Sequence, residues 1–449
     1  MSSGTQITRP GALERLKERG FFAQCTDEGT LRKRMDREPI TFYVGIDPTG
    51  DSLHVGHLVP LYAMAHMIEY GHRAIVIVGA GTARIGDPSG KTEMRRMLTE
   101  EQIDDNAAKI GRQIERFLRG HLGENQASFT MVNNMEWLAK LNYIDFLRDI
   151  GRHFSVNRML GFETYKIRLE TGLSFIEFNY QLLQSYDFLK LYQTRDCRLQ
   201  IGGDDQWGNI VAGADLIRRI EGSNAESFGL TFPLVTRSDG KKMGKTEQGA
   251  VFLSADRVSP YDFFQYWRNV ADADVRKFLL MYTFLPLAEI EDLTREGGAA
   301  LNAAKERLAY EVTVLIHGQA EADAARAAAQ ALFAGPAGAA GAGGAGSGAG
   351  LEAPGGVGDG GAGTMPIDVP GDTLSAAELR DGIGVLELYV RAGLCASRGE
   401  ARRLVQQGGA SINEEKVMDP ERIVGTEELV EGAIMLRAGK KRFFRFSVE

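Results

Sequence analysis

One stretch constrains the fold of this 449-residue chain most, because it reads as a strand, a turn and a helix in succession. Residues 41–46 (TFYVGI) are aromatic, β-branched and apolar, which predicts a short buried strand. Residues 47–50 (DPTG) interrupt it, and an apolar helical pattern follows over residues 53–70, with Asp51 and Ser52 as candidate N-caps. Such a unit is typical of α/β domains.

The first turn of the expected helix carries two histidines, His54 and His57, three residues apart and therefore on one face. Free N–H groups and the positive end of the helix dipole suit phosphate at this place. Gly56 has no side chain, so a flat base could lie close to the backbone. Two histidines alone equally fit capping, packing or solvent-facing roles, so the turn has two interpretations.

Further strands and helices alternate along the chain. The other strand candidates are residues 73–78, 129–133 and 198–202, and helical patterns occupy residues 99–118, 141–150 and 175–192. Strands that alternate with helices predict an α/β fold with a Rossmann-like, doubly wound parallel sheet. In such a sheet, ligands bind at the carboxyl ends of the strands.

Polar residues follow two of these strands. Asp87 lies in the glycine-rich stretch 79–92 and could face an ammonium group, although Asp-Pro-Ser-Gly is also an ordinary turn. The stretch is not a nucleotide-binding P-loop, because Ile85 stands where the first glycine of that motif belongs. Asp205 and Gln206 follow the strand at 198–202, again at a carboxyl end.

The helix expected over residues 175–192 carries a polar stripe. Tyr180, Gln184 and Asp187 lie at spacings of four and three, so they share one face. Such a stripe on a mostly apolar helix indicates either a binding role or a satisfied hydrogen-bond network in the core.

Composition divides the chain into five parts. We expect a catalytic α/β domain over 1–232, a connecting segment over 233–258 and an all-helical domain over 259–333. Residues 334–366 are rich in glycine and alanine, which predicts a flexible linker. Residues 367–449 return to ordinary globular composition and predict a small α+β domain.

Basic residues cluster in this last part. They are Arg398, Arg402, Arg403, Lys440 and Lys441. The arginines lie near the start of a helix that Ser397 is expected to cap, with Glu400 at the capping-box position. Clustered guanidinium groups suit a phosphate backbone, although a solvated basic face fits the same pattern.

Charge and cysteine usage exclude other classes of protein. A net charge of −8 argues against a large basic surface. The cysteines Cys25, Cys197 and Cys395 are far apart, so we expect no zinc site or disulfide framework and a reducing, cytoplasmic location. No apolar run is long enough to span a membrane, and the N-terminal residues lack a signal core.

Two motifs in order resemble the signatures of class I aminoacyl-tRNA synthetases. H-x-G-H after a strand and a D-P-T turn resembles their HIGH sequence, and KMGKT at 242–246 resembles their KMSKS loop. With IGDPSGK, NYQLLQSYDF and LQIGGDDQWGN, these segments resemble bacterial tyrosyl-tRNA synthetases over most of residues 30–250. The terminal part resembles the RNA-binding domain named after small-subunit ribosomal protein four.

The resemblance implies roles for the matching residues. Tyr43 and Asp187 would bind the phenol of tyrosine. The α-ammonium group would be held by Asp87, Tyr180 and Gln184. Gln206 and Asp205 would lie near the adenylate, with Asp205 towards the ribose. The ATP phosphates would be held by Thr49, His54, Lys242, Lys245 and Thr246, and Gly56 and His57 would lie against the nucleoside. Arg218 and Arg219 resemble a patch that receives the acceptor stem of tRNA.

The same resemblance implies a reaction and its partners. Tyrosine and ATP would give tyrosyl-adenylate and pyrophosphate, and the tyrosyl group would pass to the terminal ribose of tRNA(Tyr). Mg²⁺ would accompany ATP, without a tightly bound protein metal, and the enzyme would be a homodimer. Asp204 departs from the family pattern, in which a small residue is usual. The alternatives are a tryptophanyl enzyme, a related nucleotidyl-transferring enzyme, or a non-catalytic RNA-binding or splicing protein on a synthetase scaffold.

Overall fold

The computed structural model describes residues 11–89, 98–123, 128–246, 249–334, 371–413, 415–430, 432–439 and 442–448. The chain divides into two compact units, Met1–Val258 with Tyr266–His317, and Ser259–Gln265 with Gly318–Glu449. Beyond its first residue, the predicted linker lies outside the described residues. The domain boundaries given above remain predictions.

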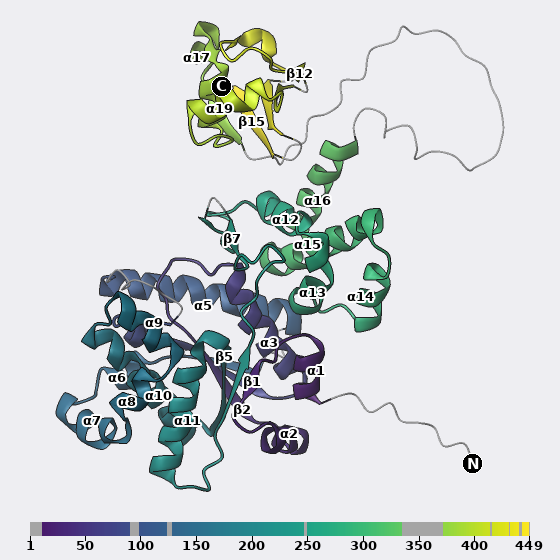
Figure 1. Ribbon diagram of the computed structural model, residues 1–449. Helices are drawn as coiled ribbons and strands as arrows, with labels where there is room; N and C mark the ends of the chain where they lie inside the picture. Colours follow the sequence, from purple (N-terminus) through teal and green to yellow (C-terminus); the bar gives the residue numbers. More distant parts are fainter. Residues whose placement is uncertain are drawn as a thin grey trace, which may run out of the picture. The chain divides into compact units, whose positions relative to one another are not determined.

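A six-stranded sheet forms the centre of the first unit (Figure 1). In spatial order its strands are β1 (Gln24–Cys25), β6 (Phe228–Phe232), β5 (Cys197–Gly203), β2 (Thr41–Ile46), β3 (Arg73–Val78) and β4 (Phe129–Asn133). All neighbours pair in parallel except β1, which runs antiparallel to β6 at the edge. The predicted doubly wound sheet is therefore confirmed, with β1 and β6 as strands that the sequence analysis missed.

Helices cover both faces of this sheet. Those of the first unit are α1 (Ala12–Glu18), α2 (Glu28–Arg37), α3 (Leu58–Glu69), α4 (Ala80–Ala83), α5 (Glu100–Leu122), α6 (Met135–Leu138), α7 (Tyr143–Asp149), α8 (Val156–Leu160), α9 (Glu163–Thr171), α10 (Phe175–Arg195), α11 (Trp207–Glu221), α13 (Asp272–Tyr282), α14 (Leu287–Thr294) and α15 (Leu301–His317). Helices α10 and α11 pack on each other and on β5, whereas α3 packs on α5 and α13. Tyr43 and Ile75 share a core with Phe188 of α10, while the buried Phe42 and Val76 alternate to the other face.

The start of α3 corrects one prediction. Asp51 and Ser52 do not cap it, because α3 begins at Leu58 after a 3₁₀ turn, Val55–His57, that His54 caps. The residues before the turn are held by tertiary contacts. The Leu53 N–H donates to Gln113 Oε1 at 2.8 Å, and Gln113 Nε2 donates to Ser52 Oγ at 3.0 Å. These bonds hold Ser52 and Leu53 outside the helix, and His54 is extended, so the helix starts later than its apolar pattern suggests.

Residues 259–334 are helical, as predicted, with α12 (Pro260–Arg268) at the division between the units and α16 (Gln319–Ala334) in the second. Helices α13 to α15 belong to the first unit. No helix in the described ranges is both long enough and apolar enough to cross a membrane.

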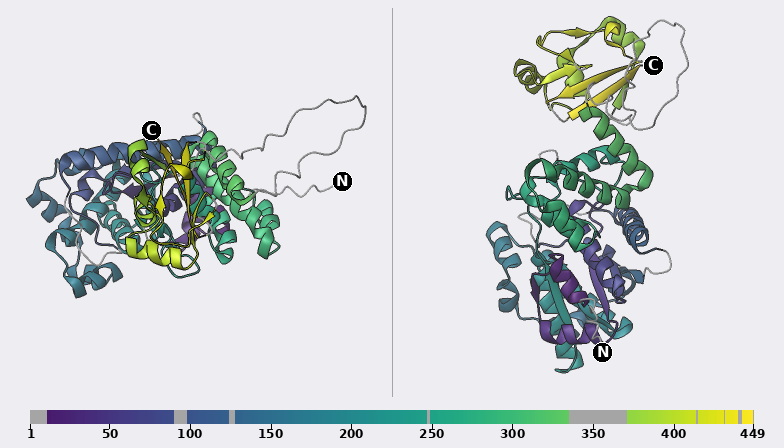
Figure 2. Two further views of the ribbon diagram at one scale, coloured as in Figure 1. Left: turned by 90° about the horizontal axis from the view of Figure 1, so that it is seen from above. Right: turned by 90° about the vertical axis from the view of Figure 1, so that its right-hand side faces the viewer.

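Residues 371–448 form an α+β fold, as expected. Its main sheet has the order β12 (Glu415–Lys416), β11 (Ala410–Ile412), β14 (Ala433–Ala438), β15 (Arg442–Val448) and β9 (Gly371–Leu374). Its remaining elements are α17 (Ala376–Asp381), β10 (Ile383–Gly384), α18 (Val385–Arg391), α19 (Arg398–Gln406) and β13 (Ile423–Val424). Figure 2 shows these helices packed against the sheet. Ser397 caps α19 as predicted, because its hydroxyl accepts the Glu400 N–H.

Candidate active site

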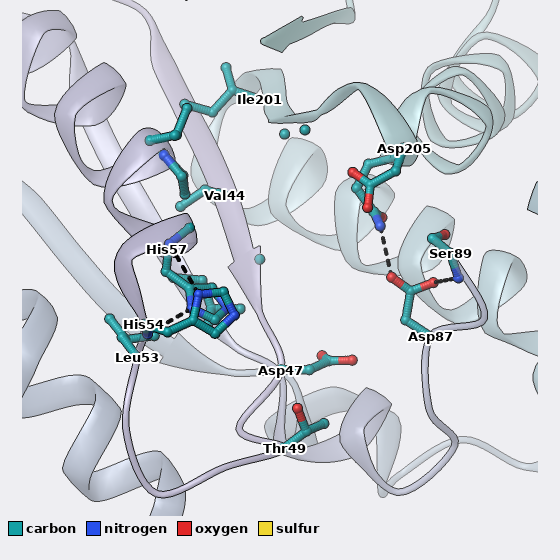
Figure 3. A pocket seen from close by; sticks show the side chains of 18 of the residues that line it. Val44, Asp47, Thr49, Leu53, His54, His57, Asp87, Ser89, Ile201 and Asp205 are labelled. Carbon is teal, nitrogen blue, oxygen red and sulfur yellow. Dashed lines mark hydrogen bonds between the residues drawn. The ribbon is translucent and has the colours of Figure 1, made fainter. Parts of the chain in front are cut away.

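A cavity of about 690 Å³ lies at the carboxyl ends of β2 and β5, and its volume suits a small-molecule ligand (Figure 3). Its lining brings together twelve predicted site residues, namely Tyr43, Thr49, His54, Gly56, His57, Asp87, Tyr180, Gln184, Asp187, Asp205, Gln206 and Lys242. The side chains of Lys245 and Thr246 lie outside the described residues, although their backbone forms β7 (Lys245–Thr246), paired with β8 (Gly249–Ala250).

The two histidines both cap and face the cavity. The Gly56 N–H donates to His54 Nδ1 at 3.0 Å, and the His54 N–H donates to His57 Nδ1 at 3.1 Å. In the neutral imidazoles the proton therefore lies on Nε2, which makes each Nε2 a hydrogen-bond donor. A Cβ atom on Gly56 would lie 2.8 Å from His54 Cε1, so the turn requires glycine there. Capping and ligand binding thus use different nitrogens of the same rings.

Carboxylates and amides surround one side of the cavity. Gln206 Nε2 donates to Asp87 Oδ2 at 2.7 Å, and the Ser89 N–H donates to Asp87 Oδ1 at 2.9 Å (Figure 3). Gln184 Nε2 reaches Gln206 Oε1 at 3.4 Å, which extends the chain of hydrogen bonds to α10. Tyr180 belongs to a second group of hydrogen bonds, which is centred on Asp47.

Asp47 is a site residue that the sequence analysis treated only as part of a turn. Its Oδ2 accepts the Tyr180 hydroxyl at 2.8 Å, and its Oδ1 accepts the Thr82 hydroxyl at 2.7 Å. Asp47 and Thr82 both line the cavity. Asp47 directly follows β2 at its carboxyl end, and this position could have identified it as a site residue from the sequence.

Tyr43 and Asp187 form the buried end of the cavity. The Tyr43 hydroxyl has no hydrogen-bond partner among the described residues, and its side chain is 1% exposed. Burial, with a contribution from the Asp187 charge, raises the pKa of Tyr43 well above its usual value, so the phenol stays protonated. Tyr43 can therefore donate to, or accept from, a ligand hydroxyl.

Asp187 is held by two residues that the sequence analysis missed. Its carboxylate accepts Asn134 Nδ2–H at 3.0 Å and Trp137 Nε1–H at 2.7 Å. Burial raises the pKa of Asp187 to about 7, although these two hydrogen bonds oppose the shift. Asn134 follows β4 directly, which is again the place where α/β sites lie, whereas nothing in the sequence singles out Trp137.

The remaining carboxylates differ in environment. Burial raises the pKa of Asp205, and the Asp87 charge adds to this effect, while the Lys242 charge opposes it. Asp204 does not line the cavity. Its Oδ1 accepts Gln24 Nε2–H at 2.7 Å and the Thr231 hydroxyl at 2.9 Å, so it ties the sheet edge together. Within the described ranges, no group of three His, Cys, Asp or Glu side chains could hold a metal ion.

The predicted RNA-contact residues are spread over both units. Arg218 pairs with Asp215, and Arg219 donates to the His153 carbonyl; both arginines lie on α11. Arg398 pairs with Glu387 at 2.6 Å and Arg402 with Glu421 at 2.7 Å, in exposed pairs of small energy. Arg403 is exposed on α19. Lys440 and Lys441 lie outside the described residues.

Comparison with known proteins assigns both parts of the chain. Residues 35–334 match the family described as tRNA synthetases class I (W and Y). Residues 367–446 match the family described as the tyrosine–tRNA ligase SYY-like C-terminal domain.

Individual relatives agree with these families. The tyrosine–tRNA ligase of Treponema denticola is 55% identical over 435 residues, which cover 97% of this chain and 98% of the relative. That of Treponema pallidum is 52% identical with the same coverage. A crystal structure of a C-terminally truncated Aspergillus nidulans mitochondrial tyrosyl-tRNA synthetase superposes with a TM-score of 0.66 at 30% identity, covering 73% of this chain and 96% of that one. The chain therefore belongs to the class I tRNA synthetases for tryptophan and tyrosine and, within them, to the tyrosine–tRNA ligases.

Proposed function

We propose that the cavity on β2 and β5 is where this tyrosine–tRNA ligase activates tyrosine with ATP. The observation that carries the proposal is the meeting, in one cavity, of the H-x-G-H turn, the aspartates Asp87, Asp187 and Asp205, and the buried phenol of Tyr43, which has no hydrogen-bond partner among the described residues. Tyr43 with Asp187 suits a phenol, and Asp87 suits an ammonium group. Asp205 suits a ribose hydroxyl, and the turn suits a triphosphate.

The tyrosine side chain would point to the buried end. Its hydroxyl would hydrogen-bond to Tyr43 and donate to the Asp187 carboxylate, which Asn134 and Trp137 hold in place. Phenylalanine would leave the buried Tyr43 hydroxyl without a partner and the Asp187 carboxylate without the ligand's donor, and would be rejected. Tyrosyl-tRNA synthetases are themselves the standard example of this kind of discrimination. The α-ammonium group would lie among Asp87, Tyr180 and Gln184, with Asp47 behind Tyr180.

ATP would bind along the H-x-G-H turn. The Nε2–H groups of His54 and His57 would donate to it, Gly56 would admit the nucleoside, and Asp205 would accept from the ribose. Thr49 and Lys242, with Lys245 and Thr246, would hold the phosphates. Mg²⁺ would arrive bound to ATP. The described residues offer it no ligand cluster, and we assign no step to it.

The proposed chemistry has two steps. A carboxylate oxygen of tyrosine attacks the α-phosphorus, and pyrophosphate leaves with the bonding electrons. A terminal ribose hydroxyl of tRNA(Tyr) then attacks the acyl carbon, and AMP leaves. No side chain forms a covalent intermediate, so catalysis consists of positioning and of stabilising charge on the phosphates.

ATP–pyrophosphate exchange with tyrosine, phenylalanine and tryptophan tests this assignment. We expect exchange with tyrosine alone. In Lys245→Ala we expect exchange to fall while tyrosine binding, measured by calorimetry, is retained. Exchange with tryptophan would overturn the amino-acid assignment, and equal exchange in the variant would overturn the role of Lys245.

The predicted homodimer has support from an apolar surface. Large hydrophobic side chains are exposed on the outer faces of α7, α8 and α10, and they are Tyr143, Ile144, Leu147, Val156 and Phe175. Among these side chains Phe175 is the most exposed, at 71%. The inner faces of these helices contribute to one hydrophobic core. We propose that a second copy covers it, as such patches on soluble proteins mark interfaces. Phe175→Asp should then shift sedimentation from dimer to monomer, and an unchanged dimer would exclude this face.

Recognition of tRNA is proposed for Arg218 and Arg219 and for the arginines of α19. Charge reversal of Arg398 and Arg402 should weaken aminoacylation of tRNA(Tyr) but leave pyrophosphate exchange unchanged, because exchange needs no tRNA. Aminoacylation equal to that of the wild type would show that Arg398 and Arg402 are not part of the RNA site. The cytoplasmic location is proposed from cysteine usage alone.

A further inference from the structure

The KMGKT loop is attached to the H-x-G-H turn through its backbone. The Val251 N–H donates to the Gly244 carbonyl at 2.9 Å, and the Val55 N–H donates to the Val251 carbonyl at 2.9 Å. Residue 251 thus links the two signatures in one ladder of hydrogen bonds. The Met243 N–H also donates to the Val235 carbonyl at 2.9 Å, which closes the loop on itself.

Gly244 touches the H-x-G-H turn directly. Its φ of +80° lies in the left-handed region, and a Cβ atom there would meet Gly56 N at 3.2 Å and Val55 Cβ at 3.3 Å. The two backbones are therefore in contact. Any movement of Gly244 changes the distance between the second signature and the histidines.

A tyrosine outside the cavity holds the remaining polar group of Gly244. Tyr266 of α12 accepts the Gly244 N–H at 3.0 Å, and its hydroxyl lies 3.1 Å from Met243 Sδ as a donor. The Tyr266 ring packs edge-on against the buried Trp267, with ring centroids 5.5 Å apart. Tyr266 does not line the cavity, so no step of the proposed chemistry uses it.

We propose that Tyr266 is a positioning residue for the reaction, whose hydroxyl holds the Gly244 amide so that Lys242 faces the cavity. Lys242 stands two residues before Gly244 and lines the cavity. In this position of the loop, both polar backbone groups of Gly244 are hydrogen-bonded, the N–H to Tyr266 and the carbonyl to Val251. The proposal rests on the proposed role of Lys242 in ATP binding. It adds a residue outside the cavity, Tyr266, that fixes the position of Lys242.

The test compares Tyr266→Phe with a matched control, Tyr282→Phe. Tyr282 is fully buried against the same Trp267 at 4.8 Å, yet its hydroxyl has no hydrogen-bond partner among the described residues. Both variants lose one buried or half-buried hydroxyl from one aromatic cluster. Only Tyr266→Phe releases the Gly244 amide.

We expect Tyr266→Phe to lower kcat/KM for ATP in tyrosine-dependent pyrophosphate exchange by roughly 3- to 10-fold, the factor that one net hydrogen bond supplies. The KM for tyrosine should stay unchanged, because the tyrosine site lies on β2 and α10. Trypsin should also cleave after Lys241 or Lys242 faster than in the control. Kinetics and cleavage equal to those of Tyr282→Phe would overturn the proposal.

A second variant separates positioning from stability. Gly244→Ala should displace the loop by steric contact with Gly56, so adding Tyr266→Phe to it should cost less than twofold more. If the fold losses of the two single variants multiply in the double variant, Tyr266 acts independently of Gly244, and the proposal is overturned. If the wild-type protein shows no tyrosine-dependent exchange, both the proposed function and this inference are overturned. If the wild type is active and Tyr266→Phe has no effect, only this inference is overturned.

Discussion

Lowering the pH from about 8 to about 6 is expected to weaken tyrosine binding, because Asp187 must be ionised to act as a charged acceptor for the phenol. Burial raises the pKa of Asp187 to about 7, inside this window. The carboxylate already accepts from Asn134 and Trp137, and its remaining lone pairs are available to the ligand. Protonation replaces one acceptor oxygen by a donor.

The size of the effect follows from the ionised fraction. With a pKa near 7, about one molecule in eleven is ionised at pH 6 and about ten in eleven at pH 8. The Kd for tyrosine should therefore be about tenfold higher at pH 6 than at pH 8. Binding near pH 7 should also release a proton.

Isothermal titration calorimetry of wild type and Asp187→Asn measures both quantities. The amide does not titrate, so the variant should bind tyrosine weakly but with the same Kd at both pH values. Titrations in buffers of different ionisation enthalpy should show proton release only in the wild type. A wild-type Kd that is constant over this range, or an equal slope in Asp187→Asn, would refute the assignment of Asp187 as the phenol acceptor.

The same shift affects stability with a defined sign. Between pH 4 and 7 the folded state binds a proton at Asp187 that the unfolded state does not, so stability is highest below this window and falls as pH rises. For Asp187, the rise in pKa from 3.8 to about 7 corresponds to about 4 kcal/mol of stability. The thermal midpoint of Asp187→Asn should therefore rise relative to wild type between pH 5 and 8.

Three further substitutions test the site and its support. Tyr43→Phe removes a hydroxyl that bonds to no described residue, so the thermal midpoint should be unchanged. The KM for tyrosine should rise several-fold and discrimination against phenylalanine should fall; an unchanged KM would exclude Tyr43 from the phenol site. Arg168→Met removes the charged partner of the 2%-exposed Glu177, which keeps only its hydrogen bonds from Ser174, and should lower the thermal midpoint by an amount that corresponds to about 3–5 kcal/mol. Adding Glu177→Gln, which removes the charge but keeps an acceptor for Ser174, should restore part of this loss, and no recovery would exclude the uncompensated charge as its cause. Gln113→Leu leaves the buried Leu53 N–H without its acceptor and should lower the stability of the folded protein by about 1–3 kcal/mol. It should lower kcat/KM for ATP more than kcat/KM for tyrosine, and equal losses would indicate a general structural role.

The local pattern was sufficient to predict the main elements and most of the site. Strands β2 to β5 span five to seven residues each, which is long enough to show an apolar or alternating pattern. The rule that ligands bind at the carboxyl ends of parallel strands placed Asp87, Asp205 and Gln206 at the cavity without coordinates. The short strand β1 escaped prediction because two residues carry no periodicity.

The start of α3 shows where local rules fail. Asp51 and Ser52 have the chemistry of N-caps, yet Ser52 and Leu53 are hydrogen-bonded to Gln113, 60 positions beyond Leu53 along the chain. The cap is therefore His54, which has an extended backbone. Which residue caps a helix depends on the backbone conformation that the rest of the fold stabilises. Contacts with distant residues decide this conformation, so a local stretch of sequence does not reveal it.

The sequence by itself determined the fold class, the two signatures and most of the polar residues that line the cavity, because periodicity and motif spacing are local properties of a chain. Only the tertiary structure decided the partners of those residues. Asn134 and Trp137 reach Asp187 from about 50 positions away, Asp47 joins Tyr180, and Tyr266 joins Gly244. Such contacts depend on how elements pack, and burial by that packing also raises the pKa of Asp187.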